Sequence, residues 1–118
     1  MKKTEIAYLA GLIDGEACVS LEKKSKRHNG LRPVIEIAMT CEKTIKYIHS
    51  ITKRGTVRPK KVSRKHYKPV WRWSVRYNDA RFIASMVLPF LITKKFEATN
   101  LISHVPLKSG RHRKQIAN

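Results

Sequence analysis

Acidic residues are scarce in this sequence. Only eight Asp and Glu accompany 26 Lys and Arg over 118 residues, and the formal net charge is +18 at pH 7. Between Lys43 and Asn78 there is no acidic residue, whereas twelve Lys and Arg occur there. A solvated surface accounts for mixed charges but not for so one-sided an excess. The composition therefore favours a polyanionic partner such as a nucleic acid.

Cysteine and long apolar runs are also few. Cys18 and Cys41 form no closely spaced pair, and the five histidines lack the spacing of metal ligands, which argues against a zinc site. The longest apolar run, at residues 6–13, is too short to cross a bilayer. Because acidic Glu5 precedes this run, no signal peptide is expected either.

The length of 118 residues fits one domain, expected at residues 1–106, and the basic end without apolar periodicity is expected to be a flexible tail at residues 107–118. No basic amphipathic helix points to a membrane surface as partner. We expect an intracellular, non-secreted protein in a reducing compartment. That compartment would be the cytoplasm or nucleoid of a prokaryote or phage host, or an organelle.

Hydrophobic spacing predicts an α+β domain with four helices and four strands. The order is α-β-β-α-β-β-α-α, which is typical of helices packed on one four-stranded antiparallel sheet. Apolar residues recur at helical intervals at residues 4–14, 42–52, 79–87 and 93–103. Apolar and polar residues alternate, as in half-buried strands, at residues 17–25, 32–40, 55–60 and 71–76.

Local signals also predict where these elements begin and end. Thr4, Thr40, Asp79 and Thr93 are expected as helix N-caps, and Gly15 is expected to end the first helix. Turns are expected at residues 26–31 and 63–67. Pro89 is expected to break the helix before it.

Each expected strand has one apolar face and one polar face. We expect the polar faces and the adjoining turns to contact the phosphates and bases of DNA. The alternative is a solvated face, because a sheet covered by helices on one side exposes the other. The residues expected to contact DNA are Ser20, Glu22, Lys24, Lys26, Arg32, Glu36, Arg58, Lys60, Arg64, Lys65, Arg72, Ser74 and Arg76.

Two acids lie at the expected end of the first helix. Asp14 and Glu16 face the negative end of the helix dipole there, which is mildly unfavourable. Carboxylates with a backbone carbonyl form a hard oxygen site suited to Mg²⁺, and a metal beside a phosphodiester can activate water. Two solvated acids are the alternative, and the residue types alone leave both interpretations open.

Residues 9–16, Leu-Ala-Gly-Leu-Ile-Asp-Gly-Glu, resemble the signature of the LAGLIDADG homing endonucleases, with Ala17 where a final glycine is common. Residues 89–95 resemble the P-x-L-x-x-K segment of that family, in which the lysine is Lys94, with Lys95 as the alternative. The resemblance covers residues 4–103 and implies a core of order α-β-β-α-β-β-α.

The resemblance also implies roles for the residues of this site. Glu16 and the carbonyl of Gly15 would bind Mg²⁺ or another divalent cation such as Mn²⁺, with Asp14 supporting them. Lys94 would stabilise charge at the scissile phosphate. Cys41 occupies a supporting position where family members often carry a polar residue that orients water, so either Thr40 or Glu42 takes over or cleavage is slow.

A single copy of the motif implies a symmetric homodimer, with Ala10 and Gly11 allowing two motif helices to touch. Such a dimer would hydrolyse phosphodiesters in a near-palindromic double-stranded DNA target and leave 3′ overhangs. The protein would then be an intron-encoded or free-standing mobile-element nuclease. The alternatives are a non-cleaving binder of the same fold, as an RNA maturase or transcription regulator, and a ribosomal or nucleoid-type basic protein.

Overall fold

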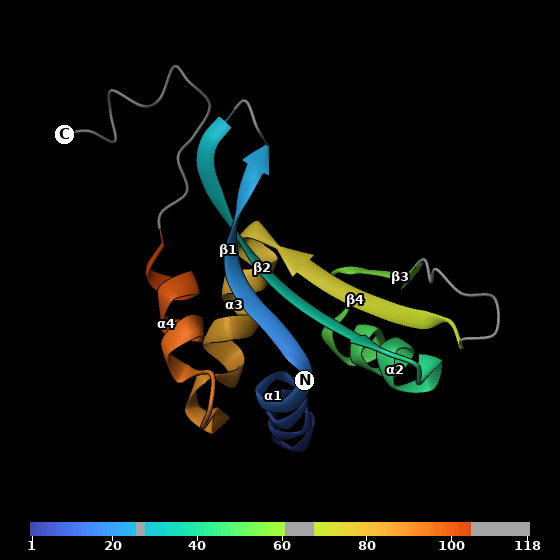
Figure 1. Ribbon diagram of the computed structural model, residues 1–118. Helices are drawn as coiled ribbons and strands as arrows, with labels where there is room; N and C mark the ends of the chain where they lie inside the picture. Colours follow the sequence, from blue (N-terminus) through green and yellow to red (C-terminus); the bar gives the residue numbers. More distant parts are fainter. Residues whose placement is uncertain (26–27, 61–67, 105–118) are drawn as a thin grey trace.

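The sheet has four antiparallel strands in the order β1-β2-β4-β3 (Figure 1). The computed structural model describes residues 1–25, 28–60 and 68–104. The expected α+β class is confirmed. The elements are α1 (Lys3–Glu16), β1 (Ala17–Ser25), β2 (His28–Met39), α2 (Glu42–Thr52), β3 (Thr56–Lys60), β4 (Val70–Arg76), α3 (Tyr77–Val87), the 3-10 helix η1 (Leu88–Phe90) and α4 (Lys95–Ser103).

The helices pack on one face of the sheet and leave the other face open. Helix α4 contacts β1, α3 contacts β2 and β4, and α2 contacts β2, β3 and β4. In Figure 1 the C-terminal end of β1 and the N-terminal end of β2 extend beyond the helices. The core includes Ile35, Ile37 and Trp73 from the sheet, together with Leu9 of α1 and Ile83 of α3.

The strand register sorts apolar from polar residues. Ile37 lies between Ala17 of β1 and Trp73 of β4, and all three are in the core. Because side chains alternate along a strand, a slip of one residue would move this apolar row to the open face. The core therefore fixes which residues the open face displays.

Helix α1 does not end at Gly15 as the sequence predicted. The helix continues through Gly15 to Glu16, because a glycine adopts helical angles as well as it adopts turns. Its N-cap is Lys2 rather than Thr4, and the backbone N–H of Lys2 donates to Glu5 Oε1 at 2.7 Å.

Three other predicted caps were also wrong. The N-cap of α2 is Cys41 rather than Thr40, and that of α4 is Lys94 rather than Thr93. Helix α3 begins at Tyr77, and Asp79 instead accepts a hydrogen bond from Arg54 Nη1 at 2.7 Å. Of these residues, Asp79 was predicted from its type and place in the sequence, whereas its observed partner Arg54 is 25 residues away.

Other boundaries were predicted well. Strand β1 and helix α2 have the expected bounds, and α3 gives way to η1 just before Pro89. The start of strand β2 was predicted wrongly, because the strand begins at His28 rather than at residue 32. The turn expected at residues 63–67 and the tail at residues 107–118 lie outside the described residues.

No helix within the described ranges combines the length and apolarity that a membrane crossing requires.

The connection from α2 to β3 is held against the core by backbone contacts. Trp73 is fully buried and its indole Nε1 donates to the carbonyl of Arg54 at 3.0 Å. Gly55 adopts φ 86°, and a Cβ there would lie 2.5 Å from the carbonyl oxygen of Ser74. Only glycine fits this approach without displacing the β4 backbone.

Gly55→Ala should lower the free energy of unfolding by about 2 kcal/mol or more, because it combines a backbone clash with a positive φ. Lys53→Gly is the matched control: Lys53 also has a left-handed φ of 53°, and glycine there should raise stability by up to about 1 kcal/mol. Urea unfolding followed by tryptophan fluorescence measures both. Equal changes in stability in the two variants would contradict a steric requirement for glycine at position 55.

Candidate functional site

The carboxylate of Asp14, near the end of α1, caps the segment that enters α4. Its Oδ2 accepts a hydrogen bond from the backbone N–H of Ile92 at 2.8 Å. Its Oδ1 accepts from the backbone N–H groups of Thr93 at 3.1 Å and Lys94 at 3.0 Å. The unfavourable place of this acid at the negative end of α1 is therefore offset by three N–H donors of another element.

Partial burial of Asp14 raises the pKa of its carboxyl, but the opposing influences are larger together. The N–H donors of Ile92, Lys94 and Thr93 and the charge of Lys94 hold the pKa of Asp14 below its ordinary value of 3.8. Asp14 is therefore ionised at neutral pH, and both its oxygens are engaged within the chain.

Lys94 completes the contact in the opposite direction. Its Nζ donates to the carbonyl oxygen of Ile13 at 3.2 Å and also to that of Ala17. A cation at the C-terminal end of a helix is favourable because the last carbonyls carry partial negative charge. We call the paired contacts of Asp14 and Lys94 the α1–α4 interlock. Lys95, the alternative lysine, is exposed on the first turn of α4.

Glu16 differs sharply from Asp14. Both Glu16 and Gly15 are exposed, and the Glu16 carboxylate makes no hydrogen bond or ion pair with any described residue. Among those residues, no three His, Cys, Asp or Glu side chains gather as a metal-binding group. One chain thus offers one carboxylate and nearby helix-end carbonyls, which fits part of the coordination shell of a hard divalent cation.

Cys41 follows β2, as expected. It is four residues beyond Ile37, which pairs with Ala17 directly after the motif helix. The hydroxyl of Thr44 donates to Cys41 Sγ at 3.1 Å, and this bond, together with backbone N–H groups of Thr44 and Lys43, lowers the pKa of the exposed thiol. The thiol is therefore more easily ionised than a free cysteine and is a better acceptor than donor.

Ala10 and Gly11 of α1 were both expected to contact a second motif helix, but they differ in exposure. Ala10 is fully buried in the core of its own chain, so its side chain is not available to a second copy. Gly11 is exposed, and a Cβ added there would have no atom within 4 Å. Of the two small residues expected at a helix–helix interface, only Gly11 lies on the surface.

The open face of the sheet, called here the polar sheet face, carries most of the residues expected to contact DNA. Arg58 of β3 lies directly opposite Arg72 of β4, and like charges in that position are destabilising unless an anion lies over them. The described residues of this face are Ser20, Glu22, Arg32, Glu36, Arg58, Lys60, Arg72, Ser74 and Arg76.

Five of the residues expected to contact DNA need separate comment. Lys24 is part of β1. Lys26, Arg64 and Lys65 lie outside the described residues. Ser74 is only 5% exposed, and its hydroxyl accepts a hydrogen bond from Arg76 Nη1 at 3.0 Å. Ser74 thus supports the Arg76 guanidinium, and the covered hydroxyl is poorly placed for a ligand.

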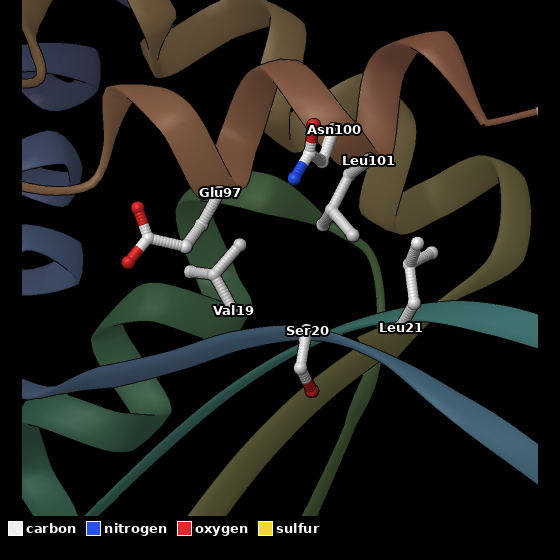
Figure 2. A pocket seen from close by; sticks show the side chains of 6 residues that line it. All are labelled: Val19, Ser20, Leu21, Glu97, Asn100 and Leu101. Atoms are coloured by element: carbon white, nitrogen blue, oxygen red, sulfur yellow. The ribbon is translucent and has the colours of Figure 1, made fainter.

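A small hollow lies on the helix side of the sheet, between β1 and α4. Figure 2 shows Val19, Leu21 and Leu101 around it, with Glu97 above, while Ser20 points to the other side of the strand. The hollow is therefore separated by the sheet from the polar sheet face.

Sequence reasoning missed the backbone groups that make the interlock. The N–H groups of residues 92–94 are 78 to 80 residues away from Asp14, so no local pattern identifies them. The signal that was present is the acid itself, since Asp near the end of a helix needs a donor from elsewhere.

Asp14→Asn should lower the free energy of unfolding by about 1 to 3 kcal/mol at pH 7, because three N–H groups lose a charged acceptor. The folded-state pKa is depressed, so this stabilisation is complete above about pH 4 and is lost as the pH falls through the lowered pKa. The difference between parent and variant should therefore shrink below about pH 4, as measured by urea unfolding across pH.

Glu97→Gln is the matched control, because the Glu97 side chain on α4 takes no part in the interlock. It should change stability by less than about 0.5 kcal/mol. A constant difference between parent and Asp14→Asn from pH 7 to pH 2 would refute the charged-acceptor role.

Comparison with known proteins identifies the fold. No protein-family model matches the chain, and no curated protein sequence does either. Several solved structures match with high structural similarity but low sequence identity. The homing endonuclease I-CvuI in complex with its target superposes with a TM-score of 0.70 at 20% identity, over 84% of this chain and 64% of that one.

Two further structures agree. The archaeal intron-encoded homing endonuclease I-Vdi141I, complexed with DNA, gives a TM-score of 0.65 at 17% identity, over 96% of this chain and 74% of that one. The LAGLIDADG homing endonuclease I-GzeII, in complex with a DNA target, gives 0.61 at 20% identity, over 94% of this chain and 41% of that one. This chain spans less than two thirds of the length of I-CvuI. With the motif at residues 9–16 at the end of α1 and the polar sheet face opposite the helices, the chain has the fold of the LAGLIDADG homing endonucleases.

Proposed function

We propose that this protein is a site-specific DNA endonuclease that hydrolyses phosphodiester bonds with a divalent cation. The observation that carries the proposal is the contrast between the two acids of the motif. Asp14 is fully engaged in the interlock, whereas Glu16 has no partner among the described residues of a chain with a net charge of +18. A carboxylate without a cation partner attracts a metal ion, whereas it repels the phosphates of DNA. We therefore assign Glu16 to metal binding.

Glu16 and the carbonyl of Gly15 would hold the cation, for which Mg²⁺ or Mn²⁺ is suited by its preference for oxygen ligands. When bound, the cation would supply an activated water and stabilise the leaving oxygen. I-CvuI, which has a similar fold, is described in complex with a DNA target in the presence of Mg, with that DNA not cleaved. Lys94 would hold the end of α1 in place, which fixes the Gly15 carbonyl relative to Glu16.

The polar sheet face would bind the duplex, with its arginines and lysines offsetting phosphate charge. One chain supplies one carboxylate, whereas cutting both strands requires two active sites. We therefore propose a symmetric homodimer formed through the exposed face of α1 around Gly11, acting on a near-palindromic target.

Glu16→Gln should keep DNA affinity within about threefold of the parent and lower Mg²⁺-dependent cleavage at least about a hundredfold, because the amide cannot replace a charged metal ligand. The substrate is first obtained by selecting cleaved molecules from a randomised duplex library. Cleavage is then measured on gels and affinity by fluorescence anisotropy.

Glu97→Gln again serves as the control and should cleave at the parental rate, because Glu97 lies on the helix side of the sheet. Undiminished cleavage by Glu16→Gln would rule out the metal assignment. A parent that binds duplexes but cuts none of the library would overturn the enzyme proposal and leave a non-cleaving DNA binder.

Gly11→Leu should weaken dimerisation on DNA at least about tenfold, because the larger side chain separates two facing helices. The isolated chain should remain folded, since the position is open and leucine favours a helix more than glycine does. Sedimentation velocity on the selected duplex measures the change. Thr99→Leu, at an exposed position of α4, should leave the dimer intact, and a parent that sediments as a monomer on DNA would reject the symmetric arrangement.

A further inference from the structure

Two acids interrupt the otherwise basic polar sheet face, and each lies beside an arginine. Glu22 of β1 lies directly opposite Arg32 of β2, with 3.5 Å between Oε1 and Nη2. Glu36 of β2 lies diagonally beside Arg72 of β4, with 3.7 Å between Oε2 and Nη1. The arginine side chains are 27% and 35% exposed, so they are partly held in place and partly accessible.

Stability does not explain these pairs. Ion pairs at such distances on an exposed surface contribute little, about 0 to 1 kcal/mol. An acid on a phosphate-binding face also weakens affinity for any duplex by like-charge repulsion. Arg58 and Arg76, on the same face, have no acidic partner among the described residues, so the pairing is selective.

The effect of a neighbouring carboxylate is to orient a guanidinium. Arginine carries five N–H donors in a rigid fork, and a carboxylate that engages one nitrogen leaves the others for a ligand. In the major groove, an arginine fork matches O6 and N7 of guanine, and a carboxylate accepts from N4 of cytosine. An Arg/Glu pair therefore carries donors for the guanine acceptors and an acceptor for the cytosine donor, so it is complementary to a G·C base pair.

We infer that Glu22/Arg32 and Glu36/Arg72 are two reading pairs that select G·C base pairs, while Arg58 and Arg76 contact phosphates. The inference rests on the proposed function, because it assumes that the polar sheet face lies in the major groove of a duplex. Within each pair the arginine contacts guanine, and the glutamate acts as a positioning residue. The negative charge of the glutamate also disfavours a guanine at the neighbouring base, because O6 and N7 of guanine are acceptors.

The strand geometry gives the spacing of the two pairs. Arg32 and Glu36 are four residues apart on β2, and Arg72 pairs with Ala38, six residues from Arg32. At about 3.3 Å per residue these separations correspond to about 13 to 20 Å along the strand. Base pairs stack about 3.4 Å apart, so the two selected positions should be about four to six base pairs apart in each half-site.

The test is a binding selection from a randomised duplex library without divalent cations, performed on the full chain and on four variants. Arg72→Lys and Glu36→Gln should both reduce the preference for G·C at one position, by about tenfold or more for the lysine variant. Arg32→Lys and Glu22→Gln should do so at a second position, about four to six base pairs away. Lysine keeps the charge but loses the fork, so overall affinity falls less than the base preference.

Two control variants distinguish base preference from the sequence-independent affinity that positive charge provides. Arg58→Gln should weaken binding to all sequences alike and lower the slope of log affinity against log salt by about 1. Asp79→Asn removes the acid of the Arg54/Asp79 pair at α3, away from the polar sheet face, and should leave the base preference unchanged. Urea unfolding of each variant verifies that the chain is folded.

Each remaining outcome is decisive. An unchanged preference in Arg72→Lys or Arg32→Lys overturns the reading assignment for that pair, and an unchanged preference in the glutamine variants overturns the positioning role. A parent that binds duplexes without any sequence preference overturns the inference but not DNA binding. A parent that binds no duplex at all overturns the proposed function as well.

Discussion

The carboxylate of Asp14 bound to three N–H groups of residues 92–94 is the contact on which the rest of the site depends. It joins the end of the motif helix to the start of α4, and Lys94 reinforces it by donating to the carbonyls of Ile13 and Ala17. A charged acceptor and a charged donor thus satisfy backbone groups at two helix ends at once. Because both helix ends are fixed, the backbone of Glu16, the last residue of α1, has a defined position while its side chain is exposed.

The interlock also explains why two acids two residues apart have different roles. Asp14 lies within reach of the donors from α4, so its charge is used inside the chain. Glu16 is exposed at the last position of the same helix, and under the proposal its charge is available to a metal ion. A basic chain with only eight acids has many arginines and lysines, so the absence of a partner for Glu16 among the described residues reflects the geometry of the helix end rather than a lack of cations.

The sequence predicted those features that depend on local alternation, and it missed those that depend on distant partners. Strand β1 and helix α2 were predicted with their observed bounds, because one face of each is buried and their side-chain periodicity records it. The caps of α1, α2, α3 and α4 were wrong, because a capping residue was chosen by type, whereas Asp79 pairs with Arg54 across 25 residues. The resemblance supplied the motif and its lysine, but it did not predict that Lys94 contacts helix carbonyls or that Ala10 is buried in its own core.

Acids are scarce in this chain, so the two acids on the polar sheet face need an explanation other than phosphate binding. If the face served only to attract phosphates, Glu22 and Glu36 would weaken it and contribute little stability in return. Glu22 lies 3.5 Å from Arg32 and Glu36 lies 3.7 Å from Arg72, whereas Arg58 and Arg76 have no acidic partner among the described residues. Under the proposal, the arginines without acids supply affinity for phosphate, and the arginines beside acids are oriented, which a sequence-specific contact requires.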